Sequence, residues 1–253
     1  IIMIYVFVEE WYEQQIAPIK SKRGRPSCFS DSEMLTVAIL SEWLKGVAWD
    51  SERGCIRYLH QHYLEWFPHL PQRSAFNSRK RHLLGVYIRL QEAIADLLCE
   101  EEVETYESVD SLPLPATTMK QFKQASRHWL WEGQIGYSKE GWFWGDRLLM
   151  SVTQSGVITG WLLGSANIND RWLMELFLST RKGCPQLVQP PRPKKHARSQ
   201  NTPPPVGFLG ALVAVGKSRS HTYLADGNFN GWRWIQHWQA RYQATVITPP
   251  RYN

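Results

Sequence analysis

Two aspartates, Asp110 and Asp226, are the residues whose type and surroundings best fit catalytic chemistry. Each follows a short apolar run, and turn or cap residues come directly after each acid. We therefore expect both carboxylates at the C-terminal edges of buried strands. Such a pair corresponds to two thirds of a metal site. No Asp or Glu among residues 227–253 provides the third acid.

The elements around these acids are predicted to begin with three strands joined by short connections, which indicate an antiparallel meander. A helix, a fourth strand, a second helix and a fifth strand follow. The expected strands span residues 105–109, 142–152, 156–163, 221–225 and 244–248, and the expected helices span residues 171–180 and about 231–242. This order resembles that of the ribonuclease-H-like fold, an α/β architecture with a mixed sheet and flanking helices.

In that topology the first and fourth strands are neighbours, so Asp110 and Asp226 would lie side by side despite their separation in the chain. Two carboxylates held a few ångströms apart repel each other and need a divalent cation between them. Mg²⁺ suits the pair, because it binds through one or two carboxylates together with water and phosphate oxygens. Mn²⁺ is a second candidate.

The N-terminal part of the chain is predicted to be an all-α domain, residues 1–104, in front of the α/β domain, residues 105–253. Ser30 and Glu33 have the spacing of a capping box before a dense apolar set. Further helices are expected over residues 49–66 and from about Ser74 to Cys99.

Basic residues are concentrated at the ends of the N-terminal helices. The net charge of +6 and the isoelectric point near 9.2 fit an anionic partner such as nucleic acid. Three helices with basic ends indicate either a helix-turn-helix-like DNA-binding module or a solvated helical bundle. The candidate DNA contacts in this part are Arg23, Arg25, Arg79, Lys80 and Arg81.

A proline-rich basic insertion is expected over residues 181–219. It contains eight Lys or Arg and seven Pro but no acid, so an extended or disordered segment is predicted. Lys194, Lys195 and Arg198 are its candidate DNA contacts. The alternative is a solvated loop without a partner.

Several segments together resemble insertion-sequence transposases with a DDE catalytic domain. The resemblance covers about residues 105–253, and Gly24-Arg25-Pro26 with the following helix is similar to the family's lead-in. The segments are Val109–Pro115, Trp144–Leu148, Ala166–Asp170, Leu224–Gly231 and Ile247–Arg251. Each is weakly specific alone, but their order is more specific.

The resemblance implies DNA cleavage and strand transfer by divalent-metal phosphoryl transfer, with Asp110 and Asp226 as catalytic residues and metal ligands. It also draws attention to Asp170, which is alternatively the N-cap of its helix, and to Arg147, a sheet-face or phosphate contact. The family's third acid is a Glu after the fifth strand. Glu175 does not substitute for it, because Glu175 precedes the fourth strand. We therefore expect a truncated chain with impaired catalysis.

The partners implied by the resemblance are the DNA of transposon ends and of a target, and a second copy of the chain in a dimer. The alternative function is a DNA-binding remnant of a transposase without catalysis. Four widely spaced cysteines form no C-x-x-C pair, so we expect neither a zinc site nor a disulfide framework. A reducing cytoplasmic setting and no membrane span are predicted, because the apolar start Ile1–Val8 is too short to cross a bilayer.

Overall fold

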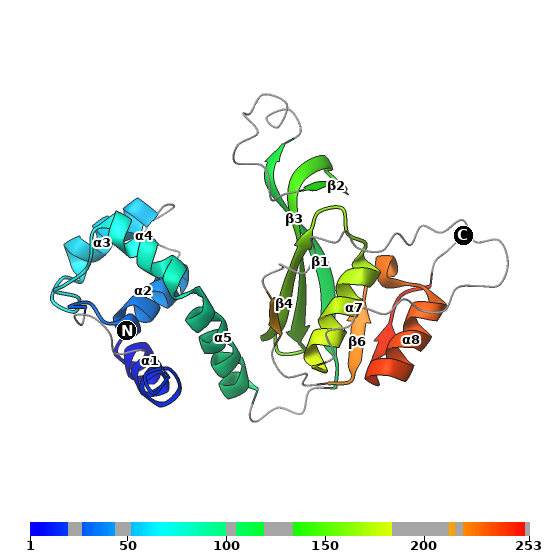
Figure 1. The fold of residues 1–253 in the computed structure, drawn as a ribbon, viewed down its shortest axis with the longest axis horizontal. Coiled ribbons are helices and arrows are strands. Elements are labelled where there is room, and N and C mark those ends of the chain that lie inside the picture. The colour runs from blue at the N-terminus through cyan, green and yellow to red at the C-terminus, as the bar shows by residue number, and fades with distance from the viewer. Residues whose placement is uncertain are drawn as a thin grey trace. The chain divides into compact units, whose positions relative to one another are not determined.

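A computed structural model of the chain describes residues 1–19, 27–43, 52–99, 105–118, 134–183, 213–215 and 220–250. The chain divides into two compact units, Ile1–Gln91 and Glu92–Asn253 (Figure 1). In the described parts the elements up to Cys99 are helical, and a mixed sheet with helices follows. The α/β class predicted from the sequence is therefore confirmed.

The first unit is built from helices around an apolar cluster. The capping box predicted at Ser30 is present: the Glu33 N–H donates to Ser30 Oγ at 3.0 Å, and Glu33 Oε2 accepts from the Ser30 N–H. Among the buried side chains are Met34 and Leu59. The helices are α1 (Ile2–Gln15), α2 (Asp31–Trp43), α3 (Glu52–His62), α4 (Arg73–His82) and the first part of α5 (Leu84–Leu98).

One long helix was predicted from Ser74 to Cys99, and this prediction was wrong. The helix is interrupted at Leu83, whose φ of −87° and ψ of 4° end α4. Leu83 is buried in the apolar cluster, and Gly85 follows two residues later. Glycine is a weak helix former, and the free energy gained by burying Leu83 offsets the cost of interrupting the helix.

The described residues of the second unit form a seven-stranded sheet in the order β5-β4-β3-β1-β6-β7, with β2 also paired to β3. The pairs β1–β3, β2–β3, β3–β4 and β4–β5 are antiparallel, whereas β1–β6 and β6–β7 are parallel. The strands are β1 (Glu107–Thr118), β2 (Gln134–Ser138), β3 (Gly141–Thr153), β4 (Ile158–Ser165), β5 (Val213–Val215), β6 (Thr222–Ala225) and β7 (Thr245–Ile247).

Strand β1 is much longer than predicted and does not end at Val109. It continues through Pro113 and Pro115 while paired with β3. Its pairing with β6 covers only residues 107–109, so within the described residues the later part of β1 has a single neighbour. Proline is tolerated on such an edge, where its missing N–H can fall on the unpaired side.

Two further strands were not predicted. Strand β2 forms a hairpin with β3 through the Lys139–Glu140 turn, and Gly141 after the turn has a φ of +113°. Strand β5 lies inside the predicted insertion and pairs with β4. The rest of that insertion beyond Gly183 and before Ser220 lies outside the described residues.

Helices α7 (Asp170–Arg181) and α8 (Trp232–Tyr242) pack together against the sheet (Figure 1). Glu175 of α7 is fully buried between them. Its carboxylate accepts hydrogen bonds from Tyr242 Oη at 2.6 Å and from Trp238 Nε1 at 3.1 Å, and His237 Nε2 lies 3.1 Å away. These contacts satisfy the buried acid and align the two helices.

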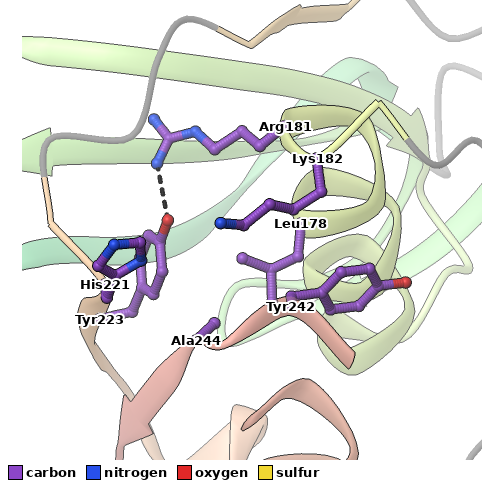
Figure 2. Close-up of a pocket in the computed structure, with 7 residues that line it drawn as sticks. All are labelled: Leu178, Arg181, Lys182, His221, Tyr223, Tyr242 and Ala244. Carbon is purple, nitrogen blue, oxygen red and sulfur yellow. Dashed lines mark hydrogen bonds between the residues drawn. The ribbon is translucent and has the colours of Figure 1, made fainter. Parts of the chain in front are cut away.

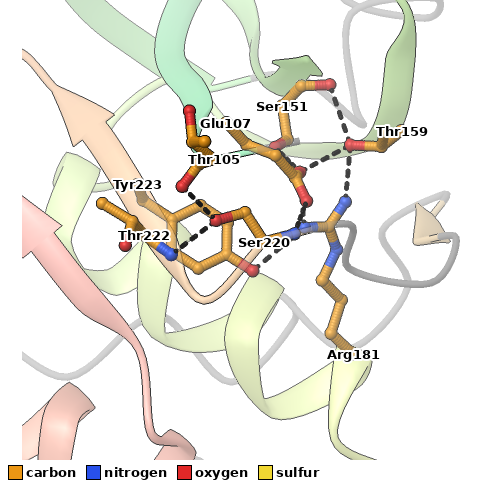
Figure 3. A network of polar contacts seen from close by, with 8 residues as sticks. All are labelled: Thr105, Glu107, Ser151, Thr159, Arg181, Ser220, Thr222 and Tyr223. Atoms are coloured by element: carbon orange, nitrogen blue, oxygen red, sulfur yellow. Dashed lines mark hydrogen bonds and ion pairs between the residues drawn. The ribbon is translucent and has the colours of Figure 1, made fainter. Parts of the chain in front are cut away.

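A second buried network joins α7 to the sheet (Figure 3). Glu107 of β1 is fully buried and lies 2.8 Å from Arg181, whose side chain is only 2% exposed. Ser151 and Thr159 donate hydroxyl hydrogen bonds to the same carboxylate oxygen, and Arg181 also donates to Tyr223 Oη at 3.1 Å. Burial alone would raise the pKa of Glu107, but Arg181 and the two hydroxyls together hold it below its ordinary value.

Two findings relate to the predictions about membrane spans and cysteines. No helix in the described ranges is long and apolar enough to cross a membrane. Cys28 is an exposed free thiol, and Cys184 lies outside the described residues.

We expect Glu107→Gln to destabilise the second unit by about 3–5 kcal/mol, because it leaves the buried Arg181 charge without its carboxylate. The double variant Glu107→Leu/Arg181→Met should recover much of this loss, since well-packed apolar side chains often replace a buried ion pair at little cost. Urea unfolding followed by tryptophan fluorescence measures both effects. Glu140→Gln, at an exposed turn, is the control. A Glu107→Gln variant as stable as this control would contradict the role of the network.

Candidate functional site

Asp110 and Asp226 lie next to each other across the parallel strands β1 and β6. Val109 pairs with Ala225, and each aspartate is the following residue. Paired strands lie about 4.8 Å apart, so the register brings the two carboxylates together. Val109 and Ala225 are buried, whereas both aspartates are exposed. Because side chains alternate along a strand, the two acids share the face opposite the apolar core.

The local backbone holds each carboxylate in place. Asp226 caps a short 3₁₀ helix (Gly227–Phe229): its Oδ1 accepts from the Asn228 N–H at 2.9 Å, and its Oδ2 accepts from Asn228 Nδ2 at 3.0 Å. Asp110 Oδ1 accepts from the Ser111 N–H at 2.7 Å. Both carboxylates therefore have preferred orientations while remaining accessible.

The electrostatic environment of Asp110 is consistent with this proximity. Partial desolvation of the carboxylate is the largest cause that raises the pKa of Asp110 above its ordinary value, and the negative charges of Asp226 and Asp170 raise it further. The Ser111 N–H and the positive charge of Lys139 act in the opposite direction. Asp110 therefore lies in an excess of negative charge, which is the condition that favours cation binding.

Asp170 begins α7 but is not its N-cap. The cap is Asn169, whose side chain accepts a hydrogen bond from the Arg171 N–H at 2.9 Å. The buried Asp170 carboxylate instead accepts from Ser111 Oγ at 2.6 Å and from Arg147 at 2.8 Å, both through Oδ1. Asp170 therefore connects α7 to β1 and β3 one residue beyond Asp110.

Asp110 and Asp226 can hold one hard divalent cation, since such an ion binds through one or two carboxylates plus water and phosphate oxygens. Within the described ranges, no cluster of three or more His, Cys, Asp or Glu is arranged for a metal ion. Asp170 is engaged by Arg147 and Ser111, and Glu175 is buried between α7 and α8. Neither acid supplies a third ligand in this arrangement.

The predicted DNA contacts fall into three groups. Lys80 and Arg81 are exposed on α4. Arg79 is largely buried and donates to Asp31 at 2.5 Å, to Ser27 at 2.8 Å and to the Phe29 carbonyl, so it serves the helical unit. The others, Arg23, Arg25, Lys194, Lys195 and Arg198, lie outside the described residues.

Arg147 lies on the sheet, as one interpretation of the sequence expected, and is not a freely exposed cation. Its side chain is 16% exposed, and it donates to Asp170 and, at 3.1 Å, to the Tyr137 carbonyl. It therefore ties β2 to β3 and α7. A phosphate contact through Arg147 would compete with these bonds.

Ser111 and Lys139 are site residues that the sequence interpretation missed. Ser111 directly follows Asp110, yet its link to Asp170 depends on the docking of α7. Lys139 belongs to the β2–β3 turn, and the sequence indicates this position only through the turn-forming Lys-Glu-Gly segment. Its effect on Asp110 depends on the fold, which periodicity does not predict.

No protein-family model matches the chain, and no curated protein matches it.

We expect Asp226→Asn to lower the pKa of Asp110 toward its ordinary value of 3.8, because the substitution removes a negative charge that disfavours ionisation. Some elevation should remain, since burial is the larger cause. Carboxyl-carbon NMR titration of the metal-free protein measures the shift. Glu140→Gln is the control, and an Asp110 pKa that responds equally to both variants would contradict the proximity of the two acids.

Asp170→Asn is expected to cost about 1.5–3 kcal/mol of stability, because it removes the negative acceptor of the Arg147 hydrogen bond. Ser111→Ala should cost less, about 1 kcal/mol, since it leaves the ion pair intact. Equilibrium unfolding in urea gives both values. Equal effects of the two variants would show that the ion pair adds nothing to the hydroxyl bond.

Proposed function

We propose that the second unit is a DDE-type catalytic domain that uses a divalent cation for phosphoryl transfer on DNA, in the manner of an insertion-sequence transposase. The observation that carries the proposal is the juxtaposition of Asp110 and Asp226 on one face of two parallel strands. Alongside desolvation, the negative charges of Asp226 and Asp170 raise the pKa of Asp110, and these charges support the proposal. The resemblance of the surrounding motifs to this transposase family points to the same chemistry.

The strand order supports a ribonuclease-H-like fold for this unit. The central path β4-β3-β1-β6-β7 contains an antiparallel meander of three strands followed by two parallel strands, with α7 and α8 as connections. In this topology the first strand of the meander is the one beside the first parallel strand. That arrangement brings Asp110 and Asp226, which are far apart in the chain, to the same edge of the parallel strand pair.

The chain's own residues have distinct roles in the proposed chemistry. Asp110 and Asp226 would hold Mg²⁺ or Mn²⁺, which supplies activation of an oxygen nucleophile and stabilisation of the leaving oxygen when bound. Asn228 orients Asp226 through two hydrogen bonds. The Ser111 N–H orients Asp110. Asp170 and Arg147 fix the strand segment that follows Asp110.

DNA is the proposed substrate because the chain has a net charge of +6. Of the predicted DNA contacts that the structure describes, Lys80 and Arg81 on α4 are exposed and are therefore best placed to neutralise phosphates. Arg79 is omitted, since it is engaged within the helical unit.

The cation site is tested by titrating Mn²⁺ into the protein and recording paramagnetic broadening of amide NMR signals. Signals of residues next to Asp110 and Asp226 should broaden first. Asp110→Asn and Asp226→Asn should each weaken Mn²⁺ affinity by roughly tenfold or more, the scale on which even outer-shell changes act at metal sites. Glu140→Gln, which removes an exposed acid from the same unit, should not change the affinity.

Nicking of supercoiled DNA with Mg²⁺ tests the reaction itself: because the described residues offer no third acid, we expect slow nicking by the parent chain, and Asp110→Asn should abolish it. Binding of Mn²⁺ that is indifferent to both aspartate substitutions would refute the metal site. Salt-sensitive DNA binding without cation binding at these residues would instead favour the non-catalytic DNA-binding alternative.

A further inference from the structure

A basic pocket lies at the opposite end of the parallel strands from Asp110 and Asp226. It has a volume of about 220 Å³ and forms where β6 and β7 begin and where α7 and α8 end (Figure 2). Its lining residues are Leu178, Arg181, Lys182, His221, Tyr223, Tyr242 and Ala244. His221 precedes β6 and Asp226 follows it, so the strand separates the pocket from the proposed cation site.

Basic groups from two elements gather at the pocket. Arg181 and Lys182 end α7, and His221 enters from the start of β6. Figure 2 shows the Lys182 side chain extending toward Tyr223 and His221. Lys182 and His221 are exposed, and neither forms a side-chain ion pair with another described residue. Their donors can therefore reach a ligand.

Arg181 supplies a buried donor whose hydrogen bonding is incomplete. The side chain is 98% buried, and its terminal nitrogens bond Glu107, Thr159 and Tyr223. Its Nε, by contrast, is buried and has no hydrogen-bond partner among the residues that the structure describes. This nitrogen is inaccessible to solvent, so Arg181 contributes positive charge to the wall of the pocket and no further donor.

The balance of charge at the pocket is positive but modest. Glu107 neutralises Arg181, and the carbonyl end of α7 disfavours an anion. Lys182 adds a full positive charge, and His221 adds another when protonated. The cavity volume of about 220 Å³ admits a tetrahedral oxyanion and part of its hydration shell.

We propose that this pocket binds a phosphate group through Lys182 and His221, with Arg181 as the buried positive wall. The proposal does not depend on catalysis at Asp110 and Asp226. The phosphate group can belong to a DNA backbone or be free inorganic phosphate, because both present the same oxygens to the donors. With the partial neutralisation by Glu107, we expect millimolar affinity for the free ion.

The test uses sodium phosphate as the probe and follows the His221 ring signals and the backbone amides of Lys182 and Tyr223 by NMR. Sodium chloride at equal ionic strength is the reference. Phosphate should shift these signals saturably, and Lys182→Gln and His221→Gln should each weaken binding about tenfold. Both positions are exposed, so neither variant should unfold the unit.

Arg57→Gln removes one positive charge at an exposed position of α3, in the first unit, and is the matched control. Its phosphate affinity should equal that of the parent chain. A parallel titration with a short single-stranded oligonucleotide separates the two sources: competition with phosphate at His221 identifies a DNA backbone, whereas phosphate binding without competition identifies the free ion. Absence of saturable phosphate shifts at the pocket, or shifts unchanged by Lys182→Gln, would overturn the proposal.

Discussion

The buried pair of Glu107 and Arg181 is the constraint on which much of the second unit depends. A charge removed from water must be paired and hydrogen-bonded, and these requirements are met only when α7 and strands β1, β3, β4 and β6 are together. Glu107 lies three residues before Asp110, and Tyr223 lies three residues before Asp226. The contacts that align the starts of β1 and β6 therefore also align the two acids where the parallel pairing of these strands ends.

As a result, the two faces of the sheet have different environments. One face packs on α7 and α8, which are joined by the buried Glu175, and the alternate residues of β1 and β6 carry the acids away from that core. Beyond Val109, β1 keeps β3 as its neighbour while its pairing with β6 has ended. The acids consequently lie where the parallel ladder stops and oxygen ligands can be approached from solvent.

Much of this arrangement was predictable because it depends on local patterns. Apolar periodicity and capping signals located α2, α7, α8 and most strands to within a few residues, and the order of elements predicted that Asp110 and Asp226 would be neighbours. Local signals were misleading where tertiary contacts compensate for them. Turn or cap residues after Asp110 suggested that β1 ends there, but pairing with β3 carries the strand on to Thr118. A continuous apolar stripe concealed the break at Leu83.

The sequence by itself determined which residues can do chemistry and which elements carry them, since residue type and periodicity are local properties. Only the tertiary structure decided how buried charges are paired. Glu107 belongs to an acidic stretch in the sequence but is the acceptor for Arg181, Asp170 is a tether between α7 and β1, and Arg79 is engaged by Asp31. Pairing depends on distances between side chains remote in the chain, and those distances exist only after the helices and strands have packed.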